Sequence, residues 1–135
     1  MRTFAIAGCC LSFICLIPGA SPQADEFTQD DLKRWQEQFM SVVQEGRKLW
    51  TDPTLGSNGL VCAQCHPNAA NTHPETYPKF QKQLGKVTPM WEMINWCLRN
   101  TLEGKDLGAS DPRMIALQAY AAYERRGVKL EPGKH

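Results

Sequence analysis

The chain has 135 residues, which is the size of one ordinary domain. Its 15 lysines and arginines almost balance 14 aspartates and glutamates, so the formal net charge is +1. This balance predicts no basic surface for nucleic acid, and four tryptophans, three tyrosines and five phenylalanines argue against a disordered chain.

The first 24 residues have the pattern of a secretory signal peptide. Arg2 precedes an uncharged apolar run over residues 4–17, and Pro18, Gly19 and a short polar stretch follow it. The run is shorter than the about 20 residues that a membrane-spanning helix needs, so we expect no stable membrane span. The expected mature protein is therefore periplasmic and consists of residues 25–135.

The first predicted helix begins at Thr28, a good N-cap, with Asp30 and Asp31 in its first turn. Apolar residues then recur at three- and four-residue intervals, which is typical of a helix with one face against a core. These residues are Leu32, Trp35, Phe39, Val42 or Val43, Gly46, and Leu49 with Trp50. Residues 52–59 contain proline, glycine, serine and asparagine, and they end the helix.

Two further helices are predicted towards the C-terminus. The second has Thr88 as its cap and Pro89 at its first position, and it runs over residues 90–100. Asp111 and Pro112 open the third, which extends to a stop at Gly127. No segment shows sustained period-two alternation. The sequence therefore predicts an all-α domain of three main helices with irregular loops.

The segment between the first two helices is long and irregular, which is unusual inside so small a domain. It contains Cys62, Cys65 and His66 in a C-x-x-C-H motif, the attachment signature of a c-type haem. On one helical turn both thiols can reach the vinyl groups of one haem edge, and the imidazole can bind the iron. We therefore expect a small cytochrome c-like domain wrapped round one covalently attached haem c.

Two other kinds of site compete for this motif. A zinc site needs four nitrogen or sulfur ligands, and only Cys97, His73 and His135 remain to complete one, at no recognisable spacing. A thioredoxin-like redox pair needs a βαβ context, which the chain lacks. Haem attachment is therefore the favoured prediction.

The ligand on the opposite face of the iron has several candidates. They are Met90, Met93, Met114, His73 and Cys97, or the position is empty. Met114 is the best placed methionine, although its position on a helical stripe favours packing. Cys97 is the odd cysteine that remains once the signal peptide leaves. It is either a small buried hydrophobe or a thiolate that stabilises Fe(III) and lowers the reduction potential.

Several short segments around these residues point to a family. They are Asn58-Gly59-Leu60, Cys65-His66-Pro67-Asn68-Ala69, Tyr77-Pro78-Lys79-Phe80, Ile94-Asn95-Trp96-Cys97, Gly104-Lys105-Asp106-Leu107 and Asp111-Pro112-Arg113-Met114. Over about residues 44–130 the chain resembles the haem domain of thiosulfate dehydrogenases and, more distantly, the A subunit of the Sox thiosulfate-oxidising cytochrome. The resemblance implies that Cys97 binds the iron opposite His66. Typical thiosulfate dehydrogenases have a second haem domain, and this sequence has no second C-x-x-C-H motif.

Two functions of different classes follow. The favoured one is electron transfer by a monohaem cytochrome linked to sulfur-compound oxidation, with a dehydrogenase subunit or another cytochrome as redox partner. The alternative is a sulfur-oxidising enzyme of thiosulfate dehydrogenase type, in which Cys97 leaves the iron to attack or carry a sulfur atom. A gas- or redox-sensing haem with a displaceable ligand is a third interpretation.

Some neighbouring residues have expected supporting roles. The sequence predicts aromatic walls for the haem, or plain core packing, from Tyr77, Phe80, Trp91 and Trp96. Three lysines either steer an acidic redox partner or form a solvated face, namely Lys79, Lys82 and Lys86. The first and last helices are expected to cross where Gly46, Leu49 and Trp50 meet Leu117 and Tyr120.

Overall fold

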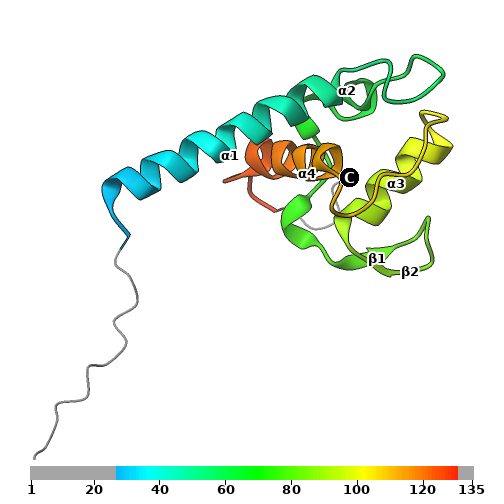
Figure 1. Cartoon of the computed structure of the whole chain (residues 1–135). Coiled ribbons are helices and arrows are strands. Elements are labelled where there is room, and N and C mark those ends of the chain that lie inside the picture. Colours follow the sequence, from blue (N-terminus) through cyan, green and yellow to red (C-terminus); the bar gives the residue numbers. More distant parts are fainter. Residues whose placement is uncertain (1–26, 131–135) are drawn as a thin grey trace, which may run out of the picture.

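The computed structural model describes residues 27–130 (Figure 1). The predicted signal peptide and His135 lie outside these residues. The main helices are α1 (Gln29–Trp50), α3 (Met90–Asn100) and α4 (Pro112–Arg125), and a single turn forms α2 (Cys62–Cys65). The 3-10 turns η1 (Pro67–Ala69) and η2 (Pro74–Thr76) and the strands β1 (Lys79–Gln81) and β2 (Lys86–Thr88) complete the described chain. The prediction of a small, mainly helical domain with three main helices is confirmed.

The structure adds a hairpin that the sequence pattern did not predict. Strands β1 and β2 pair antiparallel, with Phe80 opposite Val87. Both of these side chains are exposed and each strand has only three residues, so the hairpin leaves no sustained period-two alternation of apolar residues in the sequence. The hairpin occupies part of the long segment that was expected to be irregular.

Helix α1 begins as predicted. The Thr28 side chain accepts a hydrogen bond from the backbone N–H of Asp31 at 3.1 Å, and the Asp31 carboxylate accepts one from the N–H of Thr28 at 3.2 Å. These two bonds form a capping box.

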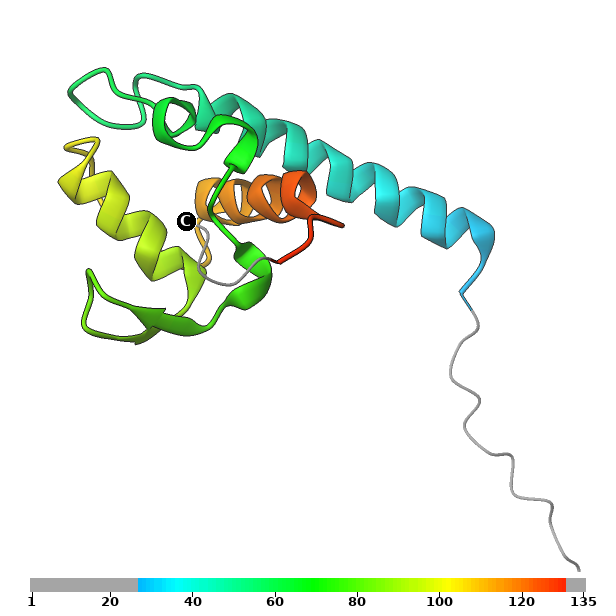
Figure 2. The same cartoon turned by 180° about the vertical axis from the view of Figure 1, so that it is seen from behind.

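The apolar stripe of α1 is buried only in its second half. Val43, Gly46 and Trp50 are buried, whereas Leu32, Trp35 and Phe39 stay exposed. Helix α4 has 14 residues and α1 has 22, so α4 covers one part of its longer neighbour. Figure 2 shows the first turns of α1 projecting beyond the rest of the domain. The stripe that the sequence places on one helix face therefore meets the core only in its second half.

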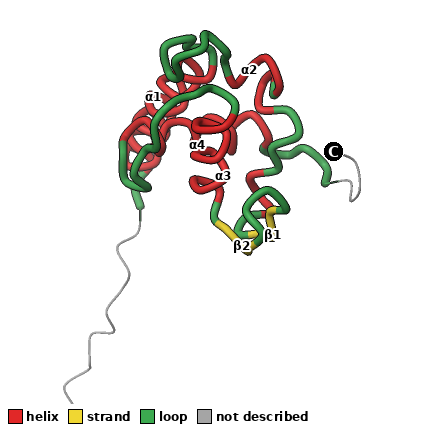
Figure 3. Tube along the Cα trace, turned by 90° about the vertical axis from the view of Figure 1, so that its right-hand side faces the viewer, coloured by secondary structure: helices red, strands yellow, loops and turns green. Residues whose placement is uncertain are grey.

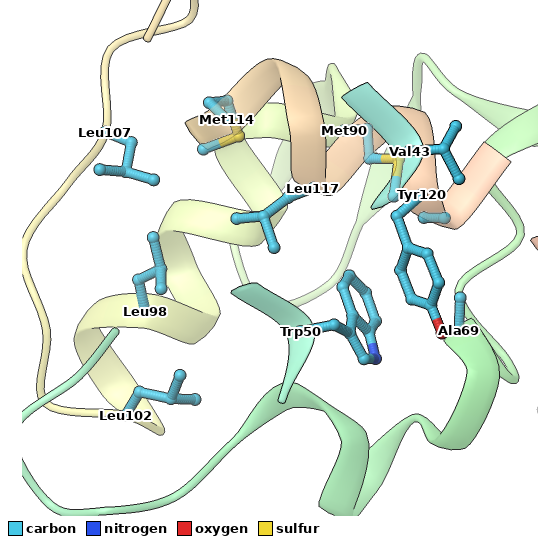
Figure 4. Close-up of a cluster of buried hydrophobic side chains, with 11 residues drawn as sticks. Val43, Trp50, Ala69, Met90, Leu98, Leu102, Leu107, Met114, Leu117 and Tyr120 are labelled. Atoms are coloured by element: carbon cyan, nitrogen blue, oxygen red, sulfur yellow. The ribbon is translucent and has the colours of Figure 1, made fainter. Parts of the chain in front are cut away.

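The core lies where α1 crosses α4. A Cβ atom added to Gly46 would lie 2.0 Å from the carbonyl oxygen of Ala116, so the two helices meet backbone to backbone. The rings of Trp50 and Tyr120 pack beside this point with 5.4 Å between their centres (Figure 4). Leu117 and Met114 of α4 are completely buried in the same cluster. The predicted crossing of the first and last helices is confirmed at Gly46, Trp50 and Tyr120.

The start of α3 differs from the prediction by one residue. Pro89, in an extended conformation, is the N-cap, and the helix begins at Met90. Thr88 belongs to β2, and its hydroxyl donates a hydrogen bond to the Glu92 carboxylate at 2.8 Å instead of capping the helix. Helix α4 begins as expected, because the Asp111 carboxylate accepts a hydrogen bond from the N–H of Arg113 at 2.9 Å.

None of the helices within residues 27–130 is both long and apolar enough to cross a membrane.

Candidate haem-binding site

The two motif cysteines lie one helical turn apart on α2. The turn begins where the backbone N–H of Val61 donates to the side-chain oxygen of Gln64 at 2.9 Å. It closes where the N–H of His66 donates to the carbonyl of Cys62 at 2.9 Å. Residues at positions i and i+3 share one side of a helix, so Cys62 and Cys65 can react with two groups on the same edge of a ligand.

The ring of His66 is held by the turn that follows it. Its Nδ1 lies 2.8 Å from the carbonyl oxygen of Ala70, so we assign the proton to Nδ1 and the free lone pair to Nε2. Asn68 and Ala69 have positive φ angles of 48° and 56°, and this bend brings the Ala70 carbonyl back to the ring. A hydrogen bond of this kind fixes the tautomer of a metal-binding histidine and raises its basicity.

Trp50 fixes the backbone of the same residue. Its indole N–H donates to the His66 carbonyl at 2.9 Å, and its ring is buried against Tyr120. The motif is thereby tied to the crossing of α1 and α4. The sequence pattern indicates only a packing role for Trp50, because its hydrogen-bond partner lies 16 residues further along the chain.

The motif residues face a cavity of about 670 Å³, a volume within the about 300–1,000 Å³ of typical cofactor sites. Its wall includes all three motif residues, Cys62, Cys65 and His66, from one side of the cavity. Helix α3 contributes Met90, Met93, Ile94, Trp96, Cys97 and Leu98, and further wall residues come from the segment 71–83. Figure 3 shows the arrangement, with α2 and the β1–β2 hairpin at opposite ends of α3. The cavity therefore lies between the motif and α3.

The cavity distinguishes among the candidates for the second iron ligand. Cys97, Met90, Met93 and His73 all line the cavity. Met114 does not line it and is completely buried in the core, which agrees with its expected packing role.

The expected aromatic walls are present with one exception. Tyr77, Phe80 and Trp96 line the cavity, whereas Trp91 does not and packs against the hydrophobic core instead. Helix α3 has a cavity side and a core side, and Trp91 lies on the latter. Its role as a haem-pocket wall was therefore predicted wrongly, and core packing, the alternative, is correct.

Burial and mutual repulsion favour the protonated thiol at Cys62 and at Cys97. Burial, followed by the nearby charge of Cys97, raises the pKa of the Cys62 thiol to about 11. Burial and the charge of Cys65 also raise the pKa of Cys97. The three sulfur atoms are thus close enough to influence one another. A bound metal ion would reverse the effect at Cys97, because coordination deprotonates a thiol.

Tyr77 lines the same cavity as these thiols. Burial raises the pKa of Tyr77 to about 12. A hydrogen bond from the Gln81 amide at 2.5 Å acts to lower this pKa, and the charge of Cys97 acts to raise it. The Tyr77 hydroxyl therefore stays protonated at neutral pH beside the cavity.

These residues fit a haem. Two thiols share one side of a helical turn, an imidazole has its Nε2 lone pair free, and apolar side chains with a further thiol line the rest of the cavity. Such a donor set provides both thioether attachment and axial ligation.

Residues 45–130 match the model of the SoxA/TsdA cytochrome c domain. The chain belongs to this family. It is 27% identical over 107 residues to a thiosulfate dehydrogenase of Allochromatium vinosum, and 29% identical over 100 residues to one of Psychrobacter arcticus. These matches cover 67% and 64% of this chain, but only 39% and 31% of the two relatives.

Family membership confirms the resemblance stated from the sequence. A SoxA/TsdA cytochrome c domain links the chain to electron transfer in the oxidation of sulfur compounds. It also implies covalently attached haem c.

Proposed function

We propose that this protein is a periplasmic monohaem c-type cytochrome that transfers electrons during the oxidation of sulfur compounds. In this proposal Cys62 and Cys65 hold the haem through thioethers, and His66 and Cys97 bind the iron from opposite faces. The observation that carries the proposal is that all four side chains line one cavity. When bound, the haem supplies one-electron Fe(III)/Fe(II) chemistry.

The protein residues tune that chemistry. The Ala70 carbonyl holds the Nδ1 proton of His66 and leaves Nε2 to act as a basic ligand. Cys97, as a thiolate, favours Fe(III) and gives a lower potential than methionine would. The apolar side chains Met90, Ile94 and Leu98 line the cavity and limit the access of water.

Location and partner follow from the same proposal. Residues 1–24 direct export, and residues 25–135 carry the haem into a compartment where another redox protein exchanges electrons with it. The proposed redox partner is a dehydrogenase subunit or another cytochrome, in keeping with a domain of the SoxA/TsdA cytochrome c family.

Attachment is tested on protein produced together with the c-type maturation machinery. We expect a Soret band that stays with the polypeptide after acid–acetone extraction and a pyridine haemochrome of the c type. The double variant Cys62→Ser/Cys65→Ser should lose the covalently bound haem. Absence of covalent haem from the parent protein would refute the proposal.

Ligation is tested by changing one cavity sulfur at a time. Cys97→Met should alter the ferric absorption and EPR spectra and raise the midpoint potential, because a neutral thioether replaces an anionic thiolate. The control is Met93→Leu, which changes another sulfur on the same wall and should leave the spectra unchanged. The opposite pattern would assign the ligand to Met93.

The second candidate function is a sulfur-oxidising enzyme of thiosulfate dehydrogenase type. It is favoured by the thiol of Cys97 on the cavity wall and by the activity named for both relatives. Two thiosulfate ions would lose two electrons in forming tetrathionate, and ferricyanide can accept them. Tetrathionate formation that Cys97→Ala abolishes would support the enzyme. Rapid electron exchange with a cytochrome acceptor without tetrathionate would support the carrier.

A further inference from the structure

The β1–β2 hairpin forms the end of the cavity that lies away from the motif cysteines. Figure 1 and Figure 3 show α2 and the hairpin at opposite ends, with α3 running between them. The α2 end supplies Cys62 and Cys65 to the cavity wall, and the hairpin supplies residues 79–83. A ligand attached at α2 must therefore direct its far edge towards the hairpin.

Two of the three hairpin lysines line the cavity, and the third does not. Lys79 is half-buried, and its Nζ lies 4.5 Å from the centre of the Tyr77 ring. Lys82 also borders the cavity from the turn that follows β1. Lys86 of β2 is directed elsewhere and makes an ion pair with Glu92 at 2.6 Å.

Within residues 27–130, neither cavity lysine has a carboxylate at ion-pair distance. None of the ion pairs in that part of the chain includes Lys79 or Lys82. Burial lowers the pKa of Lys79, and the charge of Glu75 partly opposes this effect. Because burial disfavours the ammonium form, an anion at this wall would stabilise the cation. Lys79 is partly buried and Lys82 is exposed, and because both line the cavity, an anion bound there can reach them.

Haem carries anionic groups on one edge only. Its two vinyl groups lie on one edge of the porphyrin, and its two propionate carboxylates lie on the opposite edge. Thioether formation with Cys62 and Cys65 holds the vinyl edge at α2, which turns the carboxylates towards the hairpin. We propose that Lys79 and Lys82 pair with the haem carboxylates and keep them ionised. This inference rests on the haem attachment proposed above and extends it to the far edge.

The pairing has a measurable consequence for the reduction potential. A carboxylate paired with an ammonium keeps a low pKa, so it does not take up a proton when the iron is reduced. A carboxylate without its partner has a higher pKa and takes up a proton on reduction at mildly acidic pH. The potential of the protein then rises as the pH falls.

Other titratable groups at the cavity must be controlled. His73 before η2, Tyr77 before β1 and Cys97 on α3 line the cavity, and the charge of Glu75 in η2 acts on Lys79. An imidazole is the side chain that most often changes charge between about pH 5 and about pH 8. Every protein compared therefore carries His73→Asn, because asparagine tolerates the left-handed backbone at this position, where φ is 48°.

The experiment is spectroelectrochemical titration of the holoprotein from about pH 5 to about pH 8, where an unpaired carboxylate and a paired one differ in charge. We expect a constant potential in the His73→Asn parent. Adding Lys79→Gln and Lys82→Gln should lower the potential at the alkaline end and make it rise as the pH falls. Lys86→Gln is the matched control, since it removes a hairpin lysine that does not line the cavity. Lys79→Arg with Lys82→Arg should restore the constant potential.

Infrared difference spectra give a second readout. The reduced-minus-oxidised spectrum of the double glutamine variant should contain a protonated carboxyl band at low pH that the parent lacks. The single variants Lys79→Gln and Lys82→Gln provide the same comparison if the double variant loads little haem, and each should show part of the effect.

Two results would overturn the inference. The first is a double glutamine variant whose potential varies with pH as the parent's does. The second combines two observations: added sulfate changes the spectrum of the parent but not that of the double variant, and the potential of the double variant depends on pH as the parent's does. The lysines would then bind a free anion instead of the haem carboxylates. Either result leaves haem attachment intact, whereas a parent without covalent haem refutes the proposed function itself.

Discussion

Replacing Gly46 by alanine tests whether the crossing of α1 and α4 supports the candidate site. The added Cβ would lie 2.0 Å from the Ala116 carbonyl oxygen and 2.7 Å from Cβ of Tyr120. The nearest atom belongs to the backbone of α4, so it cannot rotate away, and the helices must move apart. The substitution therefore acts on the contact that positions Trp50.

Two effects of opposite sign set the size of the change. Alanine in place of glycine within a helix stabilises by about 1 kcal/mol. Overpacking at a close contact costs about 1–3 kcal/mol or more, and a contact with backbone lies at the upper end of that range. We expect a net loss of about 2 kcal/mol from the free energy of unfolding, which lowers Tm by roughly 10 °C in a domain of this size.

The assay is urea unfolding of the holoprotein, followed by far-ultraviolet circular dichroism and by the Soret band. Gly108→Ala is the control, because nothing lies within 4 Å of its added Cβ. Its free energy of unfolding should change by no more than about 0.5 kcal/mol. Trp50 holds the His66 carbonyl, so Gly46→Ala should also alter the Soret band before global unfolding. A Gly46→Ala protein whose urea midpoint is equal to or higher than the parent's would show that the clash is relieved without loss of stability.

Three further substitutions test other parts of the structure. Asn95→Ala should lower the free energy of unfolding by about 2–3 kcal/mol, measured in urea, because it removes two buried hydrogen bonds of 2.9 Å with the backbone of Leu107. Thr28→Ala should cost about 1 kcal/mol, measured by thermal unfolding, because it removes the N-cap of α1. Tyr77→Phe should weaken the loss of stability at high pH, followed by urea unfolding at stepwise pH. The folded-state pKa of Tyr77 is raised to about 12, so the stability it contributes is complete below the unfolded value of 10.0 and is lost as the pH rises through 12.

Each of these results has a clear contrary outcome. An Asn95→Ala protein as stable as the parent would mean that water replaces the lost bonds. A Thr28→Ala protein with the parent's Tm would mean that the first turn of α1 contributes no stability. If Tyr77→Phe lost stability at alkaline pH as steeply as the parent, another group would be responsible for the loss.

Local signals allowed much of the fold to be predicted. The caps at Thr28 and Asp111 are formed by residues within three positions of each other, so the sequence is sufficient to locate both helix starts. The end of α4 near Gly127 follows from the positive φ of 72° that glycine readily adopts. The C-x-x-C-H motif is equally local, because its spacing matches one helical turn.

Features that depend on distant partners were missed. The periodic stripe of α1 predicted a helix, but only the length of α4 determines how much of the stripe is buried. The hairpin has strands of three residues with exposed central side chains, so it leaves no periodic signal. Thr88 is a plausible cap in sequence, but in the structure it bonds to Glu92 and leaves the cap to Pro89.

The same distinction holds within the candidate site. The motif predicted Cys62, Cys65 and His66, and the resemblance added Cys97. Neither could predict the bonds that hold the two walls of the cavity. The Trp50 indole binds the carbonyl of His66, and Asn95 binds both backbone groups of Leu107 from 12 residues away. Such contacts are tertiary, and residue spacing alone carries no signal for them.

The two walls of the cavity are therefore held by separate contacts. The His66 wall is tied through Trp50 to the crossing of α1 and α4, and the α3 wall is tied through Asn95 to the loop that leads into α4. Helix α4 packs against both α1 and α3, so it is the element through which the separation of the walls is set. An iron bound by His66 and Cys97 would join the walls directly. In the proposed holoprotein, ligation and helix packing would thus stabilise the same arrangement, and loss of the Cys97 bond would leave the cavity intact.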